Sequence, residues 1–140
     1  MIRALNGIAR GPNYSLKVLI GKHQFKNTQI YYIDDKGKEN KINDYIAIGS
    51  GKGEADNICK NLDHNNITMK EFTKPAYFAI MFMNQYRPAL GVGVEQEDVP
   101  RVTYLPYDKE RDEDATPEDI EEYKKYTTEK LEAVRRNLKP

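Results

Sequence analysis

The sequence of 140 residues predicts an α+β fold in which antiparallel sheets are flanked by helices. Short apolar runs rich in β-branched and aromatic residues, separated by turn signals, predict strands near the start of the chain. Three later segments carry apolar residues at helical spacing. No internal repeat or low-complexity tract is present, so residues 1–140 are expected to form a single domain, in which 108–140 is a charged loop followed by an amphipathic helix.

The first part of the chain predicts the end of a helix followed by a meander. Met1 to Arg10 carries apolar residues at helical spacing, and Gly11-Pro12 interrupts the pattern. Strands are then predicted over Leu16–Ile20, Gln29–Ile33 and Ile42–Ile48. Because the connections are short, an antiparallel meander is the simplest arrangement.

The connections between these strands carry their own signals. Residues 22–28 are polar and predict a loop. Asp34 to Gly37 predicts a turn, because aspartate caps turns with its side chain and glycine tolerates positive φ. Gly49-Ser50-Gly51 closes the third strand.

Two helices are predicted next. Glu54 to Leu62 places its apolar residues on one face. Thr68 and Glu71 form a capping box that opens a helix to about Gln85, with Pro75 near its start. Ala76 to Met83 is apolar nearly all round, so this helix is expected to be buried on more than one side.

The last third predicts two strands, a loop and a helix. Leu90–Glu95 and Val99–Leu105 form the expected strand pair, and Asp108–Asp114 is a solvated charged loop. Thr116-Pro117 begins a helix, since threonine caps it and proline suits its first turn. Its apolar stripe consists of Ile120, Tyr123, Thr127, Leu131, Val134 and Leu138.

Composition excludes several functional classes. Lysine plus arginine and aspartate plus glutamate both total 22, so a nucleic-acid or polybasic membrane-surface protein is not expected. Ala76 to Met83, the longest apolar run with eight residues, is too short to span a bilayer, and Met1 to Asn6 shows no secretory signal. Cys59 is the single cysteine, so an intrachain disulfide is impossible and a cytoplasmic location is expected.

Neither a cofactor nor a metal is expected. Gly49 to Gly53 lies between a strand and a helix, but its glycine spacing matches neither the P-loop nor the dinucleotide fingerprint. His23 and His64 are the only histidines, and Cys59 and His64 are too few for a zinc site, which needs four ligands or three and a water. The acidic run from Asp108 copies the first spacings of a calcium loop but has Glu113 where that loop needs glycine.

Two residues are candidate nucleophiles. Cys59 lies on the apolar face of its helix, where a free cysteine is usually a small buried hydrophobe. Ser50 has no histidine near it in the sequence to act as a base.

Three segments together resemble the proteasome-type N-terminal-nucleophile hydrolase family. They are Val18-Leu19-Ile20-Gly21, Ile30-Tyr31-Tyr32-Ile33-Asp34-Asp35-Lys36-Gly37 and Tyr45-Ile46-Ala47-Ile48-Gly49-Ser50-Gly51. The similarity covers Tyr14 to Leu105, the later part of such a subunit. It implies two stacked antiparallel sheets between helical layers, without the first strands.

The resemblance also implies where the chemistry would lie. In that family an N-terminal threonine is the nucleophile, assisted by an aspartate and a lysine, and all three would precede Met1. Ser50 matches the family's serine near the threonine amine and is the single accessory position retained. A later aspartate and serine align with Arg87 and Leu90, which can neither accept a proton nor supply a hydroxyl. No catalytic residue is therefore expected in this chain.

These implications favour a proteasome-like subunit, or a fragment of a threonine-type peptidase or amide hydrolase, that is inactive alone. The alternatives are a non-catalytic assembly subunit and an unrelated small α+β interaction module. The expected partners are copies of the chain, other proteasome-like subunits or a missing N-terminal half, with a polypeptide as the substrate of any active form. Nucleic acid and membrane are not expected as partners.

Overall fold

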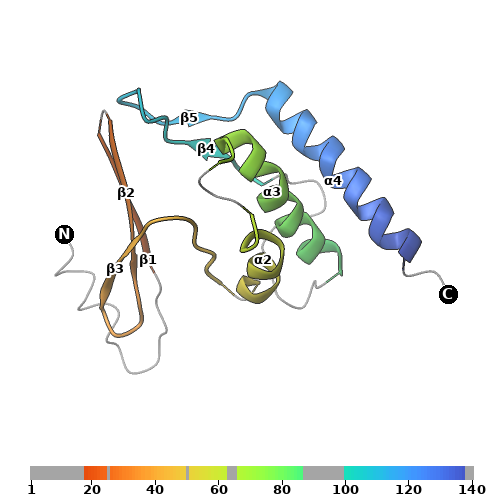
Figure 1. The fold of residues 1–140 in the computed structure, drawn as a ribbon, viewed down its shortest axis with the longest axis horizontal. Helices are drawn as coiled ribbons and strands as arrows, with labels where there is room; N and C mark the ends of the chain where they lie inside the picture. The colour runs from red at the N-terminus through yellow and green to blue at the C-terminus, as the bar shows by residue number, and fades with distance from the viewer. Residues whose placement is uncertain (1–17, 25, 50, 63–65, 87–99, 138–140) are drawn as a thin grey trace. The chain divides into compact units, whose positions relative to one another are not determined.

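A computed structural model describes residues 18–24, 26–49, 51–62, 66–86 and 100–137 of the chain (Figure 1). The described residues form two small antiparallel sheets and three helices, which confirms the α+β class. The chain divides into two compact units, residues 1–46 with 105–113 and residues 47–104 with 114–140. The elements are β1 (Val18–Gln24), β2 (Asn27–Ile33), β3 (Glu39–Ile42), α2 (Lys52–Cys59), α3 (Met69–Tyr86), β4 (Thr103–Tyr104), β5 (Glu113–Asp114) and α4 (Pro117–Asn137).

The first unit contains a three-stranded antiparallel sheet of order β1-β2-β3. Val18 lies opposite Ile33 at one end of the β1–β2 ladder, and Gln24 lies opposite Asn27 at the other. β3 pairs with the second edge of β2, with Ile42 opposite Ile30. The predicted antiparallel meander is confirmed.

The hairpin between β1 and β2 is longer than the sequence predicted. The expected loop over residues 22–28 is wrong, because the ladder continues through Gly21 to the pair of Gln24 and Asn27. Gly21 does not end β1, because its backbone pairs across the ladder as the backbone of any other strand residue does. In the connection, Lys26 has a φ of 57°, and its amide donates a hydrogen bond of 2.8 Å to the carbonyl of Tyr107.

The turn from β2 to β3 forms where it was predicted. The Asp34 carboxylate accepts hydrogen bonds from the amides of Lys36 and Lys38, at 3.0 and 2.9 Å. Gly37 has a φ of 76°, a left-handed conformation that glycine adopts without steric cost. The chain therefore reverses within five residues, so that Glu39 pairs directly with Ile33.

This tight reversal corrects the position of the third strand. The strand comprises Glu39–Ile42, whereas the prediction placed it over Ile42–Ile48. Residues 43–49 are irregular in the structure. The turn at Asp34 sets the register between β2 and β3, so it determines which residues pair. The apolar character of residues 43–49 does not determine the pairing.

In the second unit, the long helix α3 packs against α2 and against α4 (Figure 1). α3 begins with the predicted capping box: the Glu71 amide donates to Thr68 Oγ1 at 3.2 Å, and the Thr68 amide donates to the Glu71 carboxylate at 2.7 Å. Pro75 lies inside the helix and is buried. α2 begins at Lys52 and ends at Cys59, two residues earlier at the start and three earlier at the end than predicted.

The core of this unit lies along α3. The buried side chains of α3 include Tyr77, Ala79 and Met83, and Cys59 and Tyr123 are buried on α2 and α4. The rings of Tyr77 and Tyr123 lie with centroids 5.9 Å apart. Burying an apolar side chain contributes about 1.5–3 kcal/mol relative to leaving it exposed, so these contacts hold both helices on α3.

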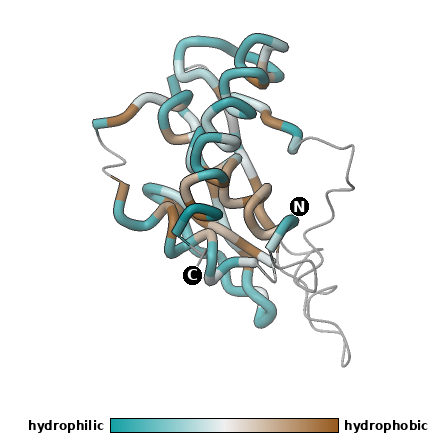
Figure 2. The backbone as a smooth tube through the Cα atoms, turned by 90° about the vertical axis from the view of Figure 1, so that its right-hand side faces the viewer, coloured by the Kyte–Doolittle hydropathy of each residue, from teal (hydrophilic) through white to brown (hydrophobic). Residues whose placement is uncertain are grey.

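The outer helix α4 has a narrower apolar side than α3. Figure 2 shows the helix that leads to the C-terminal label as mostly hydrophilic. Tyr123 and Thr127 of the predicted stripe are buried, and Leu131 and Val134 are half-buried, while Leu138 lies outside the described residues. No helix among the described residues is long and apolar enough to cross a membrane.

The short strands preceding α4 correct a further prediction. β4 pairs with β5, which lies in the segment expected to be a charged loop. Thr103 Oγ1 donates to the Asp114 carboxylate at 2.8 Å, and the Ala115 amide donates to the Val102 carbonyl at 2.9 Å. The predicted partner strand, Leu90–Glu95, lies outside the described residues, as do the predicted N-terminal helical turns.

A polar contact joins the starts of α3 and α4. The Lys70 ammonium lies 2.5 Å from the carboxylate of Asp119, which is buried in the first turn of α4. Asp119 also completes a second capping box, since its amide donates to Thr116 Oγ1 and its carboxylate accepts from the Thr116 amide. The hydrogen bond from Lys70, together with those from Thr116, lowers the pKa of Asp119.

The protein should therefore be less stable at acidic pH, because protonation of Asp119 removes its contribution to the free energy of unfolding. A carboxyl group whose pKa is lowered by folding stabilises the protein above its unfolded pKa of about 3.9, and this contribution is lost as the pH falls through the folded value. We expect urea unfolding at pH 7 and pH 3 to show a smaller pH dependence for Asp119→Asn than for the parent, and a lower stability at pH 7. Asp112→Asn, an exposed control, should retain the parent's pH dependence. Equal pH dependence in the parent and Asp119→Asn would contradict this assignment.

Candidate functional site

The glycine segment that leads into α2 is explained by backbone geometry and packing. Gly49 has a φ of 99°, which side-chain-bearing residues rarely adopt. Gly51 occupies the N-cap position of α2, and a Cβ there would collide with Sδ of the buried Met83 on α3. These two glycines let the chain turn and bring α2 close to α3.

The predicted site residues fall mainly outside the described part of the chain. This is so for Ser50, Arg87 and Leu90, so their roles stay predictions.

Cys59 is unsuited to nucleophilic chemistry. Its side chain is buried, with 3 % of its surface exposed, as the sequence predicted. Burial, and to a smaller extent the charge of Asp56, raises the pKa of the thiol. Because the thiolate is the reactive form, both effects make this cysteine inert in the folded protein.

A cluster of three tyrosines, Tyr77 of α3, Tyr104 of β4 and Tyr123 of α4, is structural rather than reactive. The hydroxyls of Tyr104 and Tyr123 are hydrogen bonded to each other. Burial, and then the bond to Tyr104, raises the pKa of Tyr123. Its phenol therefore remains protonated over the ordinary pH range. Within the described part of the chain, the buried hydroxyls of Tyr77 and Thr127 have no hydrogen-bond partner.

The described residues hold no cluster of three or more histidine, cysteine, aspartate or glutamate side chains suited to a metal ion. The acidic segment of the rejected calcium loop is exposed, and its Glu113 carboxylate lies 2.6 Å from the Lys109 ammonium.

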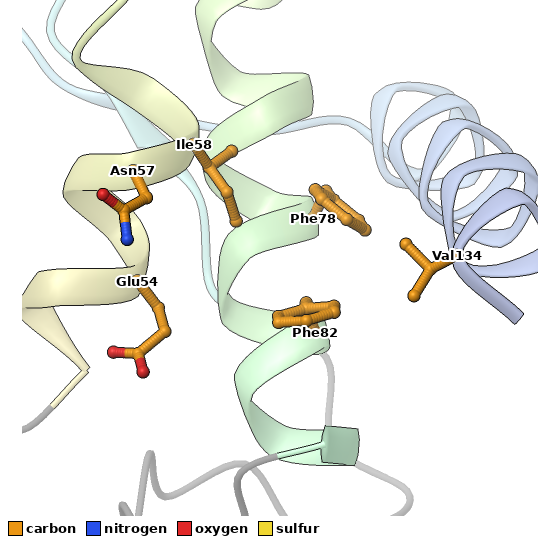
Figure 3. A pocket seen from close by; sticks show the side chains of 6 residues that line it. All are labelled: Glu54, Asn57, Ile58, Phe78, Phe82 and Val134. Carbon is orange, nitrogen blue, oxygen red and sulfur yellow. The ribbon is translucent and has the colours of Figure 1, made fainter. Parts of the chain in front are cut away.

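One cavity of about 290 Å³ lies among the three helices of the second unit. Its central wall is formed by Phe78 and Phe82 of α3, whose ring centroids are 5.7 Å apart (Figure 3). Figure 3 shows two polar side chains of α2, Glu54 and Asn57, on one side of these rings and Val134 of α4 on the other. Ile58 of α2 completes the lining.

Sequence reasoning missed this cavity because it depends on three helices at once. The apolar stretch of α3 predicted burial on more than one side, and the packing of α2 and α4 agrees with that. However, Phe78 and Phe82 remain only half-buried. The available signal was the spacing of Glu54 and Asn57, which places polar groups one helical turn apart beside the apolar Ile58.

A comparison with protein-family models matches residues 5–95 to the family described as proteasome subunit. The matched range contains the first sheet, α2, α3 and the glycine segment, and it ends before β4 and α4. A search of curated proteins gave no significant match.

The close contact of Gly51 and Met83 generates a mutational prediction. Gly51→Ala should destabilise the protein by roughly 1–3 kcal/mol, because the end of the buried Met83 side chain would have to shift to make room for the added Cβ. The matched control is Gly53→Ala, whose Cβ would meet no atom within 4 Å. It should stabilise α2 by roughly 0.5–1 kcal/mol through helix propensity.

Urea unfolding of the two variants tests this contact. In a double-mutant cycle, Met83→Ala should relieve part of the cost of Gly51→Ala, because the two changes meet at one contact. Equal stability of Gly51→Ala and Gly53→Ala would show that the contact does not constrain α2.

Proposed function

Since the chain belongs to the proteasome subunit family, we propose that it functions as a subunit that associates with other proteasome-type subunits and does not cleave polypeptides by itself. The match over residues 5–95 is the observation that carries this proposal. It contradicts the alternative of an unrelated α+β interaction module. The cytoplasm is the proposed location, in keeping with the single cysteine.

The proposed architecture is the family's sandwich of two antiparallel sheets between helical layers. The β1–β3 meander, the glycine segment and the two following helices occur in the order that the resemblance implies. In this proposal both compact units belong to one domain, which corresponds to the later part of a family subunit.

The described residues support the non-catalytic part of the proposal. The thiol of Cys59 is buried, and its pKa is raised. The titratable cluster of Lys70, Asp119 and the tyrosines is used in helix capping and packing. From the sequence, Arg87 and Leu90 stand where the family's aspartate and serine align, and neither can perform proton transfer or supply a hydroxyl.

The surface of the first sheet supports association. Among the described side chains of β1–β3, only Ile33 is fully buried. Val18, Ile20, Ile30 and several others are half-buried, and Leu19 is 41 % exposed. Apolar sheet surface of this kind gains about 25 cal/mol for each Å² that a partner covers, and unpaired strand edges favour pairing with another chain.

Association should be visible as a mass above 16.2 kDa, the mass of one chain, in light scattering at micromolar concentration. Leu19→Lys should weaken it, raising the dissociation constant about fivefold or more, because a charge replaces an apolar contact. Met69→Lys is the control, since Met69 is 51 % exposed at the start of α3 and does not belong to the first sheet. A stable monomer of the parent with one cooperative thermal transition would contradict the proposed association.

We also expect the purified chain to show no turnover of fluorogenic peptides. Nucleophile and general base act together in such chemistry, so the loss of both removes detectable cleavage. Turnover that disappears in Ser50→Ala or Cys59→Ala would place a catalytic group in this chain and overturn the non-catalytic assignment.

A further inference from the structure

We draw no further inference here: the strongest candidate, the apolar cavity between α2, α3 and α4, is open to solvent with no charge directed into it, and nothing in the described part of the chain shows what covers it.

Discussion

The second unit depends on the apolar character of α3, whose side chains must be buried on two sides of the helix. α2 and α4 pack on these two sides, and a different contact holds each of them against α3. On the α2 side, the absence of a side chain at Gly51 lets the helix approach Met83. On the α4 side, Tyr77 packs on Tyr123, and the ion pair of Lys70 and Asp119 joins the two helix starts.

The helices could be predicted closely because their signals are local. Thr68 with Glu71, and Thr116 with Asp119, each satisfy the free amides at a helix start within four residues of sequence. The third strand could not be placed in this way. Its position follows from the number of residues that the Asp34 turn consumes and from pairing with β2, which composition does not encode.

The candidate site was predictable only in part. The sequence predicted the glycine segment as a tight turn. The need for glycine at position 51 arises from the side chain of Met83, which lies 32 residues later in the chain. The cavity combines Glu54, Phe78 and Val134 from three helices, and no spacing within one helix predicts such a meeting. The resemblance predicted the family and gave Ser50 as the retained accessory residue. In the described residues, the cavity instead lies among the three helices that follow Ser50 in the sequence.

The burial of Cys59 has a practical consequence for measuring motions of this protein. Because it is the single cysteine, a thiol reagent can label the folded chain at one atom only, and that atom is covered while α2 lies on α3. The labelling rate under native conditions therefore reports how often this helix lifts away, separately from complete unfolding. A partner that stabilises the contact between the two helices would slow labelling of Cys59 without contacting the thiol. The labelling rate of this cysteine therefore reports the separation of α2 from α3.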